Sequence, residues 1–135
     1  FYGIDVSKNA ISEGEDFFKG KGLKNVFLKN FSADQLENFA DKSMDIVFTD
    51  AAIIYVGKDQ IEKVFREMMR ITKKAIILCE QHTGGKSFYD DKWAHNYEEI
   101  IKKIAPETKI DFIKIPENIW AGDWGKYGYI IKVKL

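Results

Sequence analysis

The sequence contains a single cysteine, Cys79, so it cannot form an intramolecular disulfide bond. It also lacks an excess of charge, because 21 Lys and Arg residues balance 21 Asp and Glu residues. Proteins that bind nucleic acid need a clustered excess of Lys and Arg, so we expect no nucleic-acid partner. No apolar run approaches the roughly 20 residues that span a bilayer, and we expect no signal peptide. These absences predict a protein of the reducing cytoplasm with no membrane partner.

What the sequence does contain is the composition of an ordinary globular domain. Hydrophobic residues make up 45% of the chain and charged residues 31%. A length of 135 residues suits one domain, so we expect a single domain over residues 1–135. The first residue is Phe1 rather than Met, and Phe1–Val6 already has the pattern of a buried strand. We therefore expect this domain to be incomplete at its N-terminus, with further sequence upstream.

Short apolar segments alternate with segments of helical periodicity. A helix is predicted over Lys8–Lys19, and two later helices are predicted to open at capping boxes formed by Asp59 with Glu62 and by Asn96 with Glu99. The segments predicted to be strands are Phe1–Val6, Asn25–Leu28, Met44–Phe48, Ala75–Cys79, Ile110–Ile115 and Tyr129–Leu135.

This alternation predicts an α/β fold with a mostly parallel sheet and helices on both faces. The last connection, Pro116–Gly128, contains turn-forming residues and no helical period. A parallel crossover normally needs a helix, so we expect the last strand to return antiparallel to its neighbours.

Ligands of such sheets bind outside the carboxyl ends of the strands, where Asp5 is expected to lie. A carboxylate at this position can accept hydrogen bonds from both hydroxyls of a ribose. The same position is compatible with a nicotinamide dinucleotide site. A structural alternative is that Asp5 is favoured only by the dipole of the helix that follows it.

A longer pattern is more specific. The strand and loop Met44–Val56 precede a helix that ends in Phe65–Lys74, and the apolar strand Ala75–Cys79 and then Glu80 follow. Together with Tyr2–Ser7 upstream, this order and spacing resembles class I S-adenosylmethionine-dependent methyltransferases. In that family a strand of the pattern aromatic-Asp-x-Val leads into a short loop and a helix with Arg-x-Leu/Ile-Lys near its end. The resemblance implies a Rossmann-like fold.

The resemblance also implies a cofactor, S-adenosylmethionine, and a set of residues that would bind it. The family's usual Gly-Asp-Ala adenine pattern is not matched, because Asn30-Phe-Ser32 has no Asp. By position, Asp5 with Val6 would bind the ribose, and Tyr55 would face the substrate. The adenine contact would fall on Asn30, Phe31 and Ser32, and the methionine end on Asp50 and Ala51.

The largest departure from the family is an absent glycine-rich loop. No G-x-G-x-x-G pattern occurs in the sequence, and Gly20-Lys-Gly22 follows a helix and is typical of a helix stop. In the family this loop follows a strand that precedes the position of Asp5. We therefore expect an upstream strand and glycine-rich loop to be missing from the sequence, and we expect activity to need them.

Other candidate residues carry weaker signals. His82 follows a predicted strand and is a weak candidate for a general base toward a substrate, as Tyr55 is on the substrate side. His82 and His95 have no zinc-ligand spacing with Glu80, Asp90 or Asp91, so we expect no metal site. The segment Gly84-Gly-Lys-Ser87 resembles a phosphate loop that lacks its first glycine.

Aromatic residues gather in the two C-terminal connections. They could wall a small-molecule pocket, or they could cover the core or a dimer interface. A homodimer through these aromatics, or through an exposed edge strand, is therefore a further expectation. The residues are Tyr89, Trp93, Trp120, Trp124 and Tyr127.

The function predicted from these patterns is methyl transfer from S-adenosylmethionine to a small-molecule acceptor. The sulfonium is a good leaving group, so the protein chiefly aligns the acceptor with the methyl group and needs no conspicuous catalytic dyad. Two alternatives remain open. One is a non-catalytic methyltransferase-like fragment or binding module, and the other is a nicotinamide-dependent oxidoreductase.

Overall fold

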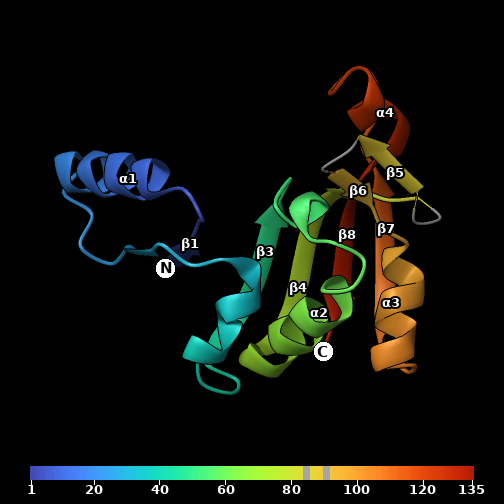
Figure 1. Ribbon diagram of the computed structural model, residues 1–135, viewed down its shortest axis with the longest axis horizontal. Helices are drawn as coiled ribbons and strands as arrows, with labels where there is room; N and C mark the ends of the chain where they lie inside the picture. Colours follow the sequence, from blue (N-terminus) through green and yellow to red (C-terminus); the bar gives the residue numbers. More distant parts are fainter. Residues whose placement is uncertain (84–85, 90–91) are drawn as a thin grey trace. The chain divides into compact units, whose positions relative to one another are not determined.

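The computed structural model describes residues 1–83, 86–89 and 92–135. The chain folds into two compact units, Phe1–Leu36 and Glu37–Leu135 (Figure 1). Residues 84–85 and 90–91 lie outside the description, and with them Asp90, Asp91 and the two glycines of the segment that resembles an incomplete phosphate loop.

The first unit is a β-α-β segment. Strand β1 (Tyr2–Ile4) pairs in parallel with β2 (Phe27–Lys29), and helix α1 (Lys8–Gly20) connects them. The Ser7 hydroxyl caps α1 by accepting a hydrogen bond of 3.2 Å from the amide of Ala10. The short helix η1 (Ala33–Asn38) follows β2. The strands are shorter than the sequence predicts, but their order, direction and connection are as expected.

The second unit contains a four-stranded sheet of order β3-β4-β8-β7. Strand β3 runs parallel to β4, whereas β8 is antiparallel to both β4 and β7, as the short final connection predicts. A small hairpin of β5 and β6 lies outside this sheet. The elements are β3 (Met44–Asp50), η2 (Ile53–Tyr55), α2 (Ile61–Ile71), β4 (Thr72–Gln81), β5 (Lys86–Tyr89), β6 (Lys92–Ala94), α3 (Tyr97–Ile104), β7 (Lys109–Lys114), α4 (Asp123–Tyr127) and β8 (Gly128–Lys134).

Helices α2 and α3 cover one face of this sheet (Figure 1). The apolar stripe of α2 is buried as its spacing predicts, and it packs toward the fully buried face of β4 and β8. The opposite face of the sheet carries the exposed side chains of Ile46, Phe48 and Ile113. The buried residues of the covered face include Val64, Phe65, Met68, Ile76, Leu78, Tyr97, Ile101, Ile131 and Val133.

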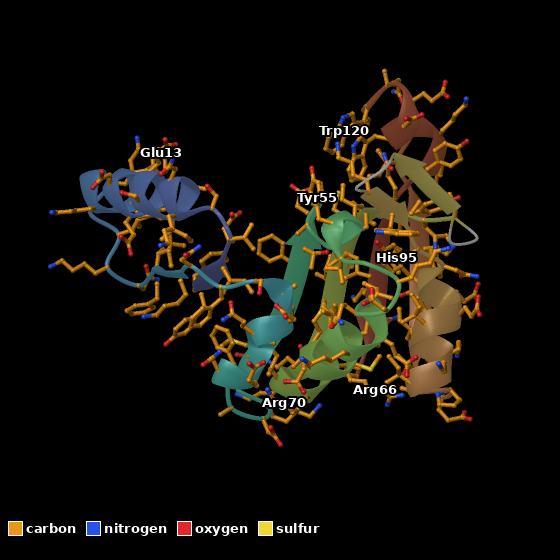
Figure 2. All side chains as sticks on the ribbon, viewed as in Figure 1. Glu13, Tyr55, Arg66, Arg70, His95 and Trp120 are labelled. Carbon is orange, nitrogen blue, oxygen red and sulfur yellow. The ribbon has the colours of Figure 1, made fainter. Side chains whose placement is uncertain are left out.

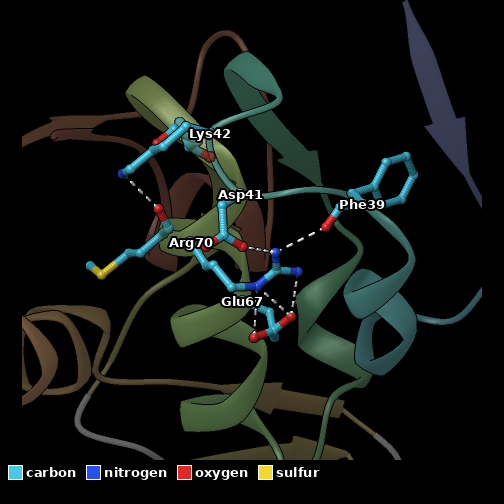
Figure 3. Close-up of polar contacts among 7 residues, drawn as sticks. Phe39, Asp41, Lys42, Glu67 and Arg70 are labelled. Atoms are coloured by element: carbon cyan, nitrogen blue, oxygen red, sulfur yellow. Dashed lines mark hydrogen bonds and ion pairs between the residues drawn. The ribbon is translucent and has the colours of Figure 1, made fainter.

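A hydrogen-bonded network joins the turn before β3 to the end of α2 (Figure 3). The Arg70 guanidinium binds the Glu67 carboxylate through two nitrogens, and it also donates to the Asp41 carboxylate and to the carbonyl of Phe39. The ammonium of Lys42 donates to carbonyls at the same end of the helix. This network explains the position of the arginine near the end of the helix in the sequence pattern.

Two local predictions are wrong. The Asp59–Glu62 capping box does not form, because α2 has Gln60 at its N-cap and no side-chain cap bond. A turn closed by the bond from the Gln60 amide to the Gly57 carbonyl leads into the helix instead. The final connection does contain a helix, the five-residue α4, although it is too short to act as a parallel crossover.

The capping box at Asn96 is confirmed, since its side chain accepts a bond of 3.3 Å from the Glu99 amide. In the part of the chain that the structure describes, none of the helices has the length and apolar character needed to cross a membrane.

Candidate functional site

Asp5 follows β1 directly, at the carboxyl end of the strand, and its side chain is exposed. One carboxylate oxygen, Oδ1, accepts a bond of 2.7 Å from the amide of Ser7, which fixes the orientation of the carboxylate. Within Phe1–Leu36 the other oxygen, Oδ2, makes no hydrogen bond. The carboxylate is therefore held by its own turn and presents a free acceptor, which is the geometry that a ribose hydroxyl needs. Val6, beside it, is 71% exposed.

Asn30 lies at the end of β2 and contacts the end of β1. Its side-chain amide donates to the carbonyl of Asp5 at 2.9 Å and to that of Val6 at 2.8 Å. These bonds use the donors of the Asn30 side chain to hold the Asp5 turn. Asn30 thus supports the Asp5 turn, and its contact with an adenine stays a prediction.

The adjoining residues Phe31 and Ser32 form a tight turn. The amide of Ser32 donates to the side-chain oxygen of Gln35 at 2.9 Å, and its hydroxyl donates to the carboxylate of Asp34. Phe31 is half-buried. The first unit therefore brings Asp5, Val6 and the segment from Asn30 to Ser32 to the same end of its parallel strands.

A hollow in the first unit lies elsewhere. It measures about 400 Å³, and none of the residues predicted to bind cofactor lines it. It is lined by Glu15, Phe18, Lys19, Gly22, Leu23, Lys24, Val26, Phe27, Leu28 and Lys29.

In the second unit, Asp50 is the last residue of β3 and Ala51 begins the loop to η2. Asp50 is exposed, and the amide of Ala51 donates to the carbonyl of Cys79 at 3.0 Å. Ala51 has a φ of 48°, in the left-handed region that an alanine rarely adopts. Such a conformation persists only where neighbouring contacts hold it.

Those contacts come from a residue that the sequence reasoning did not assign to the site. Glu80, near the end of β4, is fully buried. Its Oε1 accepts hydrogen bonds from the amides of Ala52 at 3.0 Å and Ile53 at 3.2 Å. Burial raises the pKa of Glu80 to about 7, although the hydrogen bonds from these two amides act in the opposite direction. In the sequence, the signal that could have identified Glu80 is a carboxylate at the end of an otherwise apolar strand.

Tyr55 is 58% exposed at the end of η2, and the ammonium of Lys92 lies 5.7 Å from the centre of its ring. A second cation, Lys58, lies 5.0 Å from the ring of Trp93. Tyr55 and Trp120 both lie toward the end of the sheet at which β3 finishes (Figure 2). Trp120 stacks on Trp124, with ring centres 4.6 Å apart.

His82 lies directly after β4, as predicted, but it is half-buried and its ring packs against other rings. Its Nδ1 accepts a bond of 3.3 Å from the amide of Tyr97, and the ring contacts those of Phe112 and Tyr129. Burial lowers the pKa of His82. To act as a base through Nδ1, His82 would have to release the Tyr97 amide. His95, which pairs with His82 across an isolated bridge, binds the carbonyl of Val56 at 2.9 Å.

Cys79 is half-buried within β4, and burial raises the pKa of its thiol to about 11. The thiolate that a nucleophile requires is therefore disfavoured, as expected from its place in an apolar strand. Among residues 1–83, 86–89 and 92–135, there is no group of three or more His, Cys, Asp and Glu side chains that could hold a metal ion.

The parallel strands with connecting helices and the antiparallel last strand are those of the Rossmann-like α/β class, whose ligands bind outside the carboxyl ends of the strands. Residues 1–75 match the family model described as a methyltransferase domain, and the chain belongs to this family. The cofactor of the family is S-adenosylmethionine.

Known proteins of this family include a curated relative, the demethylmenaquinone methyltransferase of Geobacillus stearothermophilus. It is 38% identical over 79 residues, which are 58% of this chain and 32% of that protein. The chain thus spans about a third of the length of this curated relative.

Solved structures share the fold. A methyltransferase dependent on S-adenosylmethionine from Aquifex aeolicus is similar with a TM-score of 0.67 and 18% identity, over 98% of this chain and 67% of that one. The [4+2]-cyclase SpnF is similar with a TM-score of 0.74 and 15% identity, over 98% of this chain and 64% of that one. These likenesses confirm the predicted Rossmann-like fold. The cyclase also illustrates that the fold alone does not fix the reaction.

Proposed function

We propose that the protein transfers the methyl group of S-adenosylmethionine to a small-molecule acceptor. The observation that carries this proposal is the Asp5 turn, in which Ser7 and Asn30 orient the carboxylate and leave one oxygen free. Two neighbouring hydroxyls of a ribose are the natural partners of such a carboxylate. Family membership supplies the identity of the cofactor, and the turn supplies a means of binding it.

The methionine end of the cofactor is assigned to Asp50 and Ala51. Asp50 is an exposed carboxylate that could pair with the cofactor's ammonium group, and Ala51 carries no bulky side chain that would obstruct an approaching ligand. The bond from the Ala51 amide to Cys79 keeps this backbone close to β4. The assignment rests on the family pattern and on the hydrogen bonds that hold this loop to β4.

When bound, S-adenosylmethionine supplies an electrophilic methyl group and a sulfonium leaving group. The residues of this chain would bind and align the reactants and exclude water, and this can accelerate transfer without a strong base. Tyr55 would then position an acceptor on the exposed side of η2. His82 has a weaker claim to a chemical role, because its Nδ1 already accepts a hydrogen bond from the Tyr97 amide.

For the acceptor we propose a small molecule with a flat apolar or aromatic part. The stacked pair Trp120 and Trp124 and the exposed Tyr55 offer ring surfaces of the required kind. The curated relative is named for an acceptor of this kind, demethylmenaquinone. A cytoplasmic location, a single domain over residues 1–135 and a homodimer through an edge strand or these aromatics remain parts of this proposal.

A glycine-rich loop is the part of the site that the printed sequence does not contain. We propose that a separate segment supplies it and that tight cofactor binding needs it. The test is calorimetric titration with S-adenosylhomocysteine of the 135-residue chain and of a longer version that carries an upstream strand and a glycine-rich loop. The longer version should bind and the shorter one should not.

Each other outcome is informative. Tight, stoichiometric binding by the 135-residue chain would show that the glycine-rich loop is dispensable. Binding by neither version would favour the non-catalytic module. Binding of a nicotinamide dinucleotide in place of S-adenosylhomocysteine would favour the oxidoreductase.

A further inference from the structure

Three successive amides after β3 are bound to β4. The amide of Ala51 donates to the carbonyl of Cys79, and those of Ala52 and Ile53 donate to the carboxylate of Glu80. Beyond the end of β3, the Glu80 carboxylate therefore accepts the hydrogen bonds that backbone carbonyls of a neighbouring strand accept within a sheet. Because Ala51 is held in the left-handed region, the loop depends on these bonds for its conformation.

Glu80 is also an unusual group to bury. Its side chain is fully inaccessible, and the structure describes no cation paired with it. Its second oxygen, Oε2, is buried without a hydrogen-bond partner among the described residues, as are Thr49 Oγ1 and Tyr97 Oη. Burying a carboxyl group costs stability, so a well-packed apolar residue would serve the core better. What an apolar residue cannot do is accept hydrogen bonds from Ala52 and Ile53.

We propose that Glu80 is a positioning residue for the cofactor site. Its carboxyl group fixes the Asp50–Ile53 loop through hydrogen bonds, and these bonds are stronger when Glu80 is ionised. The proposal rests on the proposed function, because it assigns the loop a role in binding the methionine end of the cofactor. Hydrogen bonds to a carboxylate are stronger than those to a neutral carboxyl group. Ionisation of Glu80 should therefore tighten the loop, and protonation should loosen it.

The titratable groups that face Glu80 belong to several elements. Asp50 on β3 disfavours the charged form, and Tyr97 on α3 has a raised pKa, caused first by burial and then by the charge of Glu80. His95 on the adjoining segment binds the carbonyl of Val56, directly after η2, and burial lowers its pKa from the usual 6.5. The pKa of Glu80 is raised to about 7. Substituting Glu80 alone therefore distinguishes the titration of Glu80 from that of His95.

The test begins with the 135-residue chain without cofactor. The backbone amide signals of Ala52 and Ile53 are followed by NMR from pH 5.5 to pH 8.5. They should titrate together with a midpoint near 7, and in Glu80→Gln this titration should disappear while the fold is retained. Glu13→Gln, at an exposed position of α1, is the matched control and should titrate as the unaltered protein does (Figure 2). Amides that do not titrate, or that titrate unchanged in Glu80→Gln, would overturn the proposal.

The second arm measures S-adenosylhomocysteine binding by the longer version. Affinity should rise about threefold to tenfold from pH 6 to pH 8, and Glu80→Gln should remove this dependence. If ligand binds with the same pH dependence in both proteins, the positioning role is wrong and the proposed function stands. If no ligand binds while the amides still titrate through Glu80, the proposed function is wrong and the role of Glu80 in the loop stands.

Discussion

Asn30 contacts the backbone of Asp5 and not the Asp5 carboxylate. The side-chain amide of Asn30 donates a hydrogen bond of 2.9 Å to the backbone carbonyl of Asp5. A second bond reaches the carbonyl of Val6 at 2.8 Å, so that one side chain at the end of β2 holds both residues that follow β1. The Asp5 carboxylate is left for Ser7 and for a ligand. Asn30 therefore supports the cofactor site without needing to contact the adenine.

The first prediction concerns this support. Asn30→Ala removes both bonds, each worth about 1 kcal/mol, so the amides that join β1 to β2 should exchange with solvent roughly tenfold faster or more. Hydrogen exchange of the Asp5 amide, which is bonded to the carbonyl of Lys29, is the measurement. Asn9→Ala, at an exposed position of α1, is the control and should leave this exchange unchanged. Equal exchange in both variants would show that Asn30 does not hold the turn.

The second prediction concerns Asp5. Asp5→Ala should weaken S-adenosylhomocysteine binding by the longer version by about 1–3 kcal/mol, because the ribose hydroxyls lose a charged acceptor. Asp5→Asn should weaken it less, since one acceptor oxygen remains. Asp16→Ala, at an exposed position of α1, serves as the control. An unchanged dissociation constant in Asp5→Ala, measured by calorimetry, would reject the ribose assignment.

The third prediction compares two arginines of the same helix. Arg70 binds Glu67, Asp41 and the Phe39 carbonyl, whereas among the described residues Arg66 forms one ion pair, with Glu62. Lysine can replace the charge of either residue but not the several directed bonds of Arg70. Arg70→Lys should therefore lower the urea midpoint of unfolding, and Arg66→Lys should change it little. Equal midpoints for the two variants would show that the network in Figure 3 adds nothing to stability.

How far the sequence alone predicts this structure depends on the range of the interactions. The six strands β1 to β4, β7 and β8 and the Asn96 cap follow from residues within one turn or one strand of each other, and they were predicted, whereas the β5–β6 hairpin was not. The Asp59 box failed because the turn from Gly57 shifts the start of α2 past it. The family pattern located Asp5 and Asp50 at strand ends, but their exact contacts remain predictions.

The roles of Asn30 and Glu80 were not predictable, because their partners are distant in the sequence. Asn30 binds carbonyls 24 and 25 residues away, and Glu80 binds amides 27 and 28 residues away. Composition and periodicity identify which side chains are polar and which face they occupy. They do not identify which backbone group a polar side chain meets once the strands are aligned.

The fourth prediction is the pH dependence of stability. The pKa of Glu80 is raised to about 7 in the folded chain from the usual 4.5, so the folded state binds more protons between these values. Its contribution to the free energy of unfolding should be largest below pH 4.5 and should decline, by about 3 kcal/mol in all, as the pH rises through 7. His82 and His95 act oppositely, because burial lowers the pKa of each.

The contribution of Glu80 is therefore measured as the difference in the free energy of unfolding between the unaltered protein and Glu80→Gln. Urea unfolding at pH 5, 6, 7 and 8 should show this difference moving in favour of the variant as the pH rises. A constant difference over this range would mean that Glu80 does not change its ionisation on unfolding.

The last prediction concerns Tyr97, whose hydroxyl is buried without a hydrogen-bond partner among the described residues. An unpaired buried hydroxyl destabilises the folded chain, because it gives up its bonds to water. Tyr97→Phe keeps the ring in contact with Phe65 and His82 and removes only this oxygen, so stability at pH 7 should stay equal or rise by about 1 kcal/mol. Tyr129→Phe is the control for loss of a hydroxyl at a less buried position. If Tyr97→Phe instead loses about 1 kcal/mol or more in urea unfolding, the hydroxyl has a partner in solution, and the Glu80 NMR titration repeated in this variant would show whether that partner is the carboxyl group.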